Sequence, residues 1–447
     1  MQKNFSVFWE IVPGNMCNLK CLGCYAAEGG RPDKRILGKN ELKLLINRIV
    51  DLGCDKVDTL GGEPLLHQDL LFAVQYFKKR NPKGFYGIVT NGLLLNYEKA
   101  YKLKKAGLDQ ITFSLDGVTD KVNDASRGTG SFRKTLNGIK NAKRVELSFT
   151  ISFTLNKFNL DQSLLFVPFA ENIGANSVGA QIIEKSGRAK KFWDEISITR
   201  EEGLAAICEM FRRRPNIFIA ISSRIKFKQF LNKFWNAGLE LGDERCMGGL
   251  SNLMISSGGD ISPCSLYTYQ QNKKVKNLIC DDFEEIKSFI DTKYLKFNQT
   301  VRKQAAQKFI TCRNCKFSGL LCNPCPLANK FKIVKECEWV TRQEILLQDK
   351  ILKSKLKCLI QPKNISQNRL IFYVKTQNKP LFLEISLSKF NKFFQAKNVK
   401  EIVSWFKETS ATEKIVRFVC QLRSHGIIEI EKFRLPIFDQ AVNLKYY

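Results

Sequence analysis

Histidine is almost absent from this sequence. Of its 447 residues only His67 and His425 carry an imidazole, so general acid–base chemistry would fall mainly to carboxylates. Nothing in the sequence singles out one catalytic acid or base. His67 follows Glu63-Pro64 closely and is expected to cap or fill the core rather than to act as a catalyst.

Long apolar runs are also missing. No stretch of about 18 uncharged apolar residues occurs, which excludes a transmembrane helix. The first four residues are not followed by the apolar core and small-residue cleavage site of a signal peptide. We therefore expect a cytoplasmic protein with no membrane partner. Its length predicts two or three domains, and 44% hydrophobic residues suffice for a core.

Negative charge is scarce as well. Asp and Glu number 43 against 72 Lys and Arg, giving a net charge of +29. Such an excess can indicate nucleic acid, an acidic peptide partner, or lysine-rich composition without a partner. The lysines are spread along the chain and basic runs such as 212–214 are short. This distribution favours a solvated surface, so nucleic acid is not expected to be the partner.

Cysteine, in contrast, is abundant, with fifteen residues. In such a chain they indicate metal sites in a reducing compartment rather than a disulfide framework. The first group is Cys17, Cys21 and Cys24, after an apolar run that predicts a buried strand over residues 5–12. A disulfide cannot use three thiols, and no fourth Cys or His follows nearby for zinc. An iron–sulfur cubane held at three irons fits, and three scattered thiols are the alternative.

Strands and helices alternate from residue 5 to about residue 222. This pattern predicts six βα units, a parallel sheet and right-handed crossovers. The predicted strands cover residues 5–12, 56–60, 84–90, 110–114, 145–154 and 177–183, with one extra strand at 217–222. The cysteine loop and three Gly-containing segments, 61–64, 90–92 and 114–117, all fall at carboxyl ends of these strands. We therefore expect one site at that edge of the sheet.

The cysteine spacing, followed by Tyr25 and by Gly61-Gly62-Glu63-Pro64, closely resembles the radical S-adenosylmethionine (SAM) enzymes. The resemblance covers about residues 1–340. It implies that Cys17, Cys21 and Cys24 hold a [4Fe–4S] cluster whose fourth iron binds the methionine part of SAM. An electron from the cluster then breaks a sulfonium C–S bond to give a 5′-deoxyadenosyl radical, which abstracts hydrogen from the substrate. It also implies an α/β fold, a partial (β/α)6 TIM-like barrel.

The same resemblance implies a set of SAM-binding residues. Gly61 and Gly62 let the backbone approach a ligand, and Glu63 suits the methionyl ammonium, although a plain β-turn is the alternative. Ser114 can bond a carboxylate or ribose, and Arg127 can fork onto the SAM carboxylate unless it is a surface charge. Asn91 joins the set or is only a turn residue.

A second cysteine group follows at Cys246, Cys264, Cys312, Cys315, Cys322, Cys325 and Cys337. Its two Cys-x-x-Cys pairs are compatible with a zinc ribbon. The order of seven cysteines resembles the SPASM extension, which carries two auxiliary [4Fe–4S] clusters. The resemblance implies a distal set of Cys312, Cys315, Cys322 and Cys337 and a proximal set of Cys246, Cys264 and Cys325. The gaps around Cys322 are six and two residues where the family has five and three. The proximal set has no obvious fourth ligand unless Cys280 supplies it; core or helix-entry packing is expected for Cys280.

Beyond residue 360 a hairpin, two helices and a strand are predicted, which resembles the PqqD-type peptide-recognition domain, a small α+β winged-helix-like fold. A DNA-binding winged helix or a plain accessory domain are the alternatives. The expected domains are a radical SAM barrel (1–222), a bridge with auxiliary clusters (223–345) and a peptide-recognition domain (360–447).

These features together predict an enzyme that matures a precursor peptide carrying a leader. It would abstract hydrogen and form a thioether or carbon–carbon crosslink, using SAM, [4Fe–4S] clusters and an electron donor such as flavodoxin or ferredoxin. Two alternatives stay open. One is a sulfatase-maturing or other protein-modifying radical SAM enzyme, and the other is a metal-stabilised nucleic-acid-binding protein.

Overall fold

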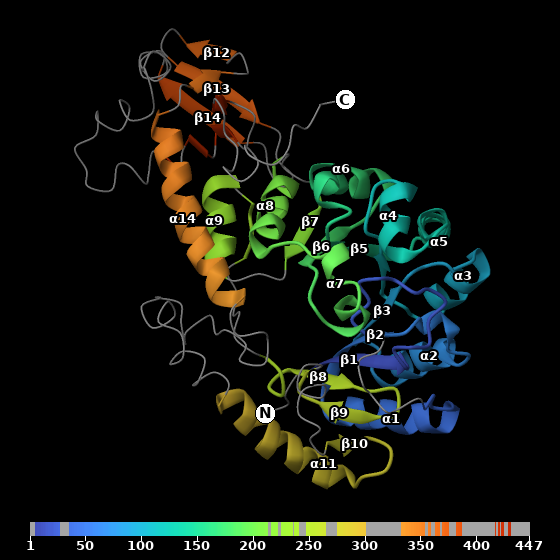
Figure 1. Ribbon diagram of the computed structural model, residues 1–447. Coiled ribbons are helices and arrows are strands. Elements are labelled where there is room, and N and C mark those ends of the chain that lie inside the picture. Colours follow the sequence, from blue (N-terminus) through green and yellow to red (C-terminus); the bar gives the residue numbers. More distant parts are fainter. Residues whose placement is uncertain are drawn as a thin grey trace. The chain divides into compact units, whose positions relative to one another are not determined.

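The computed structural model (Figure 1) divides the chain into two compact units. The first comprises 1–203, 217–222 and 243–334, and the second comprises 204–216, 223–242 and 335–447. The structure describes residues 5–26, 35–212, 216–221, 225–235, 237–240, 247–264, 275–300, 332–353, 356–358, 363–366, 369–374, 381–386, 416, 419–420, 422–423 and 428–430. The domain boundaries expected from the sequence stay a prediction.

The first unit is built on a ten-stranded sheet in the order β10-β9-β8-β1-β2-β3-β4-β5-β6-β7. Strands β1 to β7 pair in parallel and in sequence order, and β8 adds in parallel to β1. Strand β9 pairs antiparallel with β8, and β10 pairs antiparallel with β9. The strands are β1 (Phe5–Val12), β2 (Cys54–Gly61), β3 (Phe85–Thr90), β4 (Gln110–Ser114), β5 (Ser148–Leu155), β6 (Ser177–Ile182), β7 (Phe218–Ile221), β8 (Asn252–Ile255), β9 (Asp260–Ser262) and β10 (Lys276–Asn277). The predicted α/β fold with a parallel sheet is confirmed.

Helices connect the parallel strands, and several of them have a buried apolar face. They are α1 (Lys39–Asp51), α2 (Leu70–Arg80), α3 (Tyr97–Lys105), α4 (Asp120–Arg127), α5 (Ser131–Arg144), α6 (Ser163–Ile173), α7 (Trp193–Ile196) and α8 (Arg200–Met210), with α11 (Phe283–Phe289) after β10. In α1 the residues at helical spacing, Leu42, Leu45, Ile46 and Ile49, are fully buried. No helix in the described ranges combines the length and apolar character that a membrane crossing requires.

The fifth strand begins three residues later than the sequence predicts. Helix α5 ends at Arg144, and Glu146 adopts a positive φ of 53°. A left-handed residue of this kind closes a helix terminus. Residues 145–147 therefore form the turn between α5 and β5, although Val145 and Leu147 are apolar.

Helix α4 was not predicted, because its sequence has few apolar residues. Its buried face is polar instead, with Asn123 and Ser126 inside. Asp124 of α4 also caps the next helix: its carboxylate accepts hydrogen bonds from the Gly130 and Phe132 N–H groups, at 2.5 and 2.8 Å. Helix α5 has no capping side chain of its own, so Asp124 takes that role.

We expect Asp124→Ala to lower the free energy of unfolding by about 1–2 kcal/mol, the usual effect of losing a helix cap. The hydrogen bonds to Gly130, Ser131 and Phe132 would all be lost. Thermal unfolding monitored by circular dichroism measures the change. Asp120→Ala is the matched control on the same helix, because the Asp120 carboxylate is exposed, where it pairs with Arg133 and accepts from the adjacent Lys121 N–H. Equal losses in the two variants would contradict the capping role.

The second unit contains α9 (Ile225–Trp235) and α14 (Lys332–Lys353). Aromatic side chains join them, since Trp339 of α14 lies 6.0 Å from the Phe230 ring and 6.2 Å from the Phe227 ring of α9. An ion pair at 2.7 Å links Lys233 to Glu344.

Two small antiparallel sheets complete this unit, β12-β13-β14 and β11-β15. They consist of β11 (Leu356–Cys358), β12 (Lys363–Ser366), β13 (Arg369–Val374), β14 (Leu381–Ser386) and β15 (Ile428–Ile430). The predicted hairpin is confirmed as the β13–β14 pair, and the predicted last strand as β15. The helix expected over 398–406 lies outside the described residues. A winged-helix architecture stays a prediction.

Candidate functional site

The loop after β1 brings the three predicted cluster cysteines into one region. All three side chains are half-buried. Burial raises the pKa of the Cys17 thiol, and the neighbouring Glu63 and Cys24 add to that rise. Burial also raises the pKa of the Cys21 thiol, to about 11, against the lowering effect of Arg127, and Cys24 and Cys17 contribute to the rise. The three sulfurs are therefore close enough to interact electrostatically.

The donor set of this loop suits a cluster better than a single ion. Within the described residues, no group of three or more Cys, His, Asp or Glu side chains closes around one metal ion. A structural zinc needs four ligands about 2.0–2.3 Å from one ion. In a four-iron cubane each thiolate binds its own iron, so the thiolates stand further apart. Cys17, Cys21 and Cys24 on one loop would supply one thiolate to each of three irons.

Two segments distant in sequence hold the cysteine loop. The carboxyl end of α4 offers its carbonyls: Ser126 O accepts from the Leu22 N–H at 2.8 Å, and Arg127 O from the Cys21 thiol at 3.7 Å. Arg188 donates from Nη1 to the Cys21 carbonyl at 3.2 Å and from its backbone to the Cys24 carbonyl at 2.9 Å. The sequence has no local feature that points to Arg188, because the cysteines that it contacts lie more than 160 residues away along the chain.

Gly61 and Gly62 lie directly under the start of the cysteine loop. Gly61 has a φ of +128°, and a Cβ on it would stand 2.2 Å from the Val12 carbonyl oxygen. A Cβ on Gly62 would stand 1.9 Å from the Met16 carbonyl oxygen. Any side chain here would push the cysteine loop away. The close approach shown is between two parts of the chain itself, so contact of these glycines with SAM stays a prediction.

The Glu63 carboxylate joins the ends of β2 and β3. It accepts hydrogen bonds from Leu65 N (3.0 Å), Thr90 Oγ1 (2.5 Å) and Asn91 N (2.9 Å) and is almost fully buried. Burial raises the pKa of Glu63, partly opposed by these donors. Three protein donors thus occupy its oxygens, and binding of an ammonium by Glu63 stays a prediction.

Asn91 links the ends of β2 and β3 to Cys17, the first cysteine of the loop. Its amide nitrogen donates to Asn18 Oδ1 at 2.7 Å and lies 3.7 Å from the Cys17 sulfur. Its amide oxygen accepts from the Leu93 N–H at 3.0 Å, and its carbonyl accepts from Thr135 Oγ1 at 2.8 Å. Asn91 therefore does more than form a turn, because it fixes the position of the Cys17 segment.

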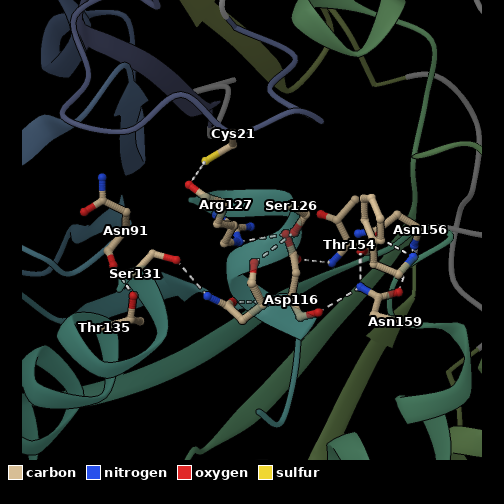
Figure 2. A network of polar contacts seen from close by, with 12 residues as sticks. Cys21, Asn91, Asp116, Ser126, Arg127, Ser131, Thr135, Thr154, Asn156 and Asn159 are labelled. Atoms are coloured by element: carbon tan, nitrogen blue, oxygen red, sulfur yellow. Dashed lines mark hydrogen bonds and ion pairs between the residues drawn. The ribbon is translucent and has the colours of Figure 1, made fainter. Parts of the chain in front are cut away.

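Arg127 and Asp116 form a buried ion pair beside the loop (Figure 2). Arg127 Nε lies 2.7 Å from Asp116 Oδ2, and the two side chains are only 13% and 7% exposed. Asp116 Oδ1 also accepts from the Thr154 N–H at 2.9 Å. Ser114, two residues before Asp116, is half-buried at the end of β4. The sequence placed the segment 114–117 at this edge but gave Asp116 no role.

Of the second cysteine group the structure describes two members. Cys264 is half-buried just after β9, and Cys337 is half-buried on α14. The other members, Cys246, Cys312, Cys315, Cys322 and Cys325, lie outside the described residues. The auxiliary clusters therefore stay a prediction.

The isolated cysteines can also be placed. Cys54, Cys208 and Cys420 are buried in the core. Of the two positions expected for Cys280, the core position is wrong, because the residue is exposed; it lies just before the N-terminus of α11. Its backbone N–H donates to the Asn277 side chain in the turn before α11, and this turn holds the residue outside the core.

His67 has the structural role expected of it. Its Nδ1 accepts from the Asp69 N–H at 3.0 Å, and the ring is buried. Burial disfavours the charged imidazolium and lowers the pKa of His67 below its ordinary value of 6.5, against the opposing effects of Asp69 and the Leu37 backbone.

Lowering the pH from about 7.5 to about 5.5 should destabilise the protein in part through His67. The unfolded chain takes up a proton near pH 6.5 while the folded chain resists it, so stability falls as the pH drops below that value. His67→Asn keeps an acceptor for the Asp69 N–H and removes the titration. The variant should therefore lose less thermal stability between the two pH values than the wild type. Parallel losses would show that His67 does not titrate in this range.

Comparison with known proteins agrees with this geometry. Residues 11–163 match the model of the Radical SAM superfamily. An AdoMet-dependent heme synthase of Methanosarcina barkeri is 28% identical over 269 residues, covering 58% of this chain and 76% of that protein. Streptococcus suis SuiB bound to S-adenosylmethionine shares the fold with a TM-score of 0.56 at 18% identity, covering 71% of this chain and 72% of that one. Native anSMEcpe with bound AdoMet gives 0.54 at 16% identity, covering 75% and 95%. The segment from the end of β1 to the start of α6, which includes the cysteine loop and Gly61-Gly62, is therefore a radical SAM domain.

Proposed function

We propose that this protein is a radical SAM peptide maturase, which abstracts hydrogen from a precursor-peptide residue and forms a thioether or carbon–carbon crosslink. The observation that carries the proposal is the gathering of Cys17, Cys21 and Cys24 on the Gly61-Gly62 corner, at the carboxyl ends of parallel strands. When bound, the [4Fe–4S] cluster supplies the electron that breaks a C–S bond of SAM.

The described residues contribute position and charge to that chemistry. Gly62 and the Glu63 N–H hold the start of the cysteine loop, and α4 and Arg188 hold its middle. Arg127 places a positive charge next to Cys21, which favours its thiolate. Ser114 and Arg127 would bind the carboxylate or ribose of SAM, and the backbone at Gly61, Gly62 and Glu63 would receive its ammonium.

The peptide substrate is supported by a structural neighbour. SuiB, which shares the fold with a TM-score of 0.52 in that complex, has been solved with its precursor peptide SuiA. The hairpin β13–β14 offers a sheet edge to which an extended leader could add as a strand. Auxiliary clusters on the second cysteine group would take up the electron left when the crosslink closes.

Anaerobic reconstitution with iron and sulfide tests the proposal. The purified chain should bind about twelve irons, enough for three cubanes, and cleave SAM to 5′-deoxyadenosine when reduced. Stoichiometric zinc without iron would defeat it. About four irons with SAM cleavage would keep the radical SAM site and remove the auxiliary clusters.

A protein-modifying enzyme is the second candidate, because anSMEcpe shares the fold and has been solved with a bound peptide. Deleting residues 360–447 separates the two. A maturase that recognises a leader through this segment should lose turnover of its precursor while SAM cleavage persists. Unchanged turnover would favour the alternative.

A further inference from the structure

The Asp116 carboxylate is a buried charge to which the proposed function gives no role. Only 6% of the residue is exposed. One carboxylate oxygen accepts from Thr154 N and the other faces Arg127 Nε. Its backbone is held as well, since Asp116 N donates to Asn123 Oδ1 at 2.9 Å and Asp116 O accepts from Asn159 Nδ2 at 3.0 Å (Figure 2). Asp116 is thus fixed from both sides at the ends of β4 and β5.

Asp116 reaches the cysteine loop through Arg127. The Arg127 carbonyl accepts from the Cys21 thiol, and the preceding carbonyl accepts from Leu22 N. Figure 2 shows Cys21, Arg127 and Asp116 in a row, with Thr154 beyond Asp116. Polar contacts therefore link four segments without a break: the cysteine loop, the end of α4, the end of β4 and the end of β5.

Arg127 carries its positive charge in this buried setting. Burial alone would lower the pKa of Arg127, but Asp116 and then Cys21 and Cys24 raise it above its ordinary value. A charge that water does not screen acts strongly on a neighbouring redox centre. Charge and hydrogen bonds around the sulfurs set the potential of an iron–sulfur cluster. A lone guanidinium here would favour the more negative, reduced cluster, and Asp116 supplies the opposite charge.

We propose that Asp116 is a positioning residue that anchors the Arg127 guanidinium beside Cys21 and offsets its charge, and thereby keeps the reduction potential of the cluster low. This inference rests on the cluster site of the proposed function. A low potential matters because the cluster must reduce a sulfonium, so the ion pair adjusts the driving force for SAM cleavage.

Asp116→Asn tests the proposal with little change of shape. Asparagine keeps the oxygen that accepts from Thr154 N but turns an NH2 group toward Arg127 Nε, where a carboxylate oxygen stood. Redox titration followed by EPR, without SAM, should show a more positive midpoint potential. The front-cluster signal is isolated by subtracting the spectrum of a Cys17→Ala/Cys21→Ala/Cys24→Ala variant.

The double variant Asp116→Asn/Arg127→Gln distinguishes charge from packing. Removing both charges should return the midpoint potential toward the wild-type value, whereas Arg127→Gln alone should move it in the negative direction. Asp120→Asn removes an exposed carboxylate on the same helix as Arg127, where Asp120 pairs with Arg133 of α5, and should leave the potential unchanged.

Three results would overturn the inference: an unshifted potential in Asp116→Asn, a double variant that does not return toward the wild type, or an equal shift in Asp120→Asn. If Asp116→Asn does not fold, the double variant decides. Recovery of folding and cluster binding would support an uncompensated charge as the cause, because removing both members of a buried pair costs less than removing one. Failure of both would make Asp116 merely structural. A wild type without any front cluster would refute the proposed function itself, and this inference with it.

Discussion

Cys21→Ala should abolish SAM cleavage and remove about four irons from the reconstituted protein, the content of one cubane. Cys21 is the middle one of the three proposed cluster ligands, and its thiol donates to the Arg127 carbonyl at the end of α4. With two thiolates left, the cluster loses its anchor on that side of the loop. Iron content and 5′-deoxyadenosine formation after anaerobic reduction measure the two effects.

Cys54→Ala is the matched control for that experiment. Cys54 is also buried, but it starts β2 at the amino end of the sheet, and burial raises the pKa of its thiol to about 12. It lies at the opposite end of β2 from Gly61 and the cysteine loop, and its thiol donates to the Lys56 carbonyl at 3.2 Å, so it is not placed to bind the front cluster. The control should retain iron and SAM cleavage. If Cys21→Ala also retained the full iron content, the front cysteines would not hold a cluster.

Glu63→Ala should lower the free energy of unfolding by about 3–5 kcal/mol, because it leaves several buried donors without an acceptor. The donors are Leu65 N, Thr90 Oγ1 and Asn91 N. Since Asn91 also contacts Asn18 and Cys17, the loss should spread to the cysteine loop and weaken SAM binding. Chemical denaturation measures the first effect, and equilibrium binding of SAM to the reconstituted protein measures the second.

Two further variants sharpen the test at Glu63. Glu63→Gln keeps the shape and one acceptor oxygen but presents an NH2 group to a donor, so its stability should lie between wild type and Glu63→Ala. Glu98→Ala removes an exposed carboxylate paired with Lys102 and should leave both stability and SAM binding unchanged. A fully stable Glu63→Ala would contradict the role of Glu63 in joining β2 to β3.

The strands show how much of the fold could be predicted from the sequence. The predicted bounds of β1 and β4 match the structure. β1 is mostly buried, and in β4 the buried Ile111 and Phe113 alternate with half-buried polar residues, which is the period of a strand with one face in the core. The predictions failed where the local pattern was misleading. Val145 and Leu147 are apolar but lie in a turn, and the polar α4 is a helix whose buried face is hydrogen-bonded rather than apolar.

The sequence by itself determined where the front site lies and predicted its chemistry, because the three cysteines lie within one loop and Gly61-Gly62 lie within the next. Parallel strands then bring their carboxyl ends to one edge. Only the tertiary structure revealed that the Glu63 carboxylate accepts hydrogen bonds from Thr90 and Asn91. It also revealed that Arg188 holds the cysteine loop and that Asp116 faces Arg127. These contacts join residues far apart along the chain, and no local periodicity encodes them. They arise when the sheet and α4 pack together, which leaves buried polar groups that can be satisfied only by one another.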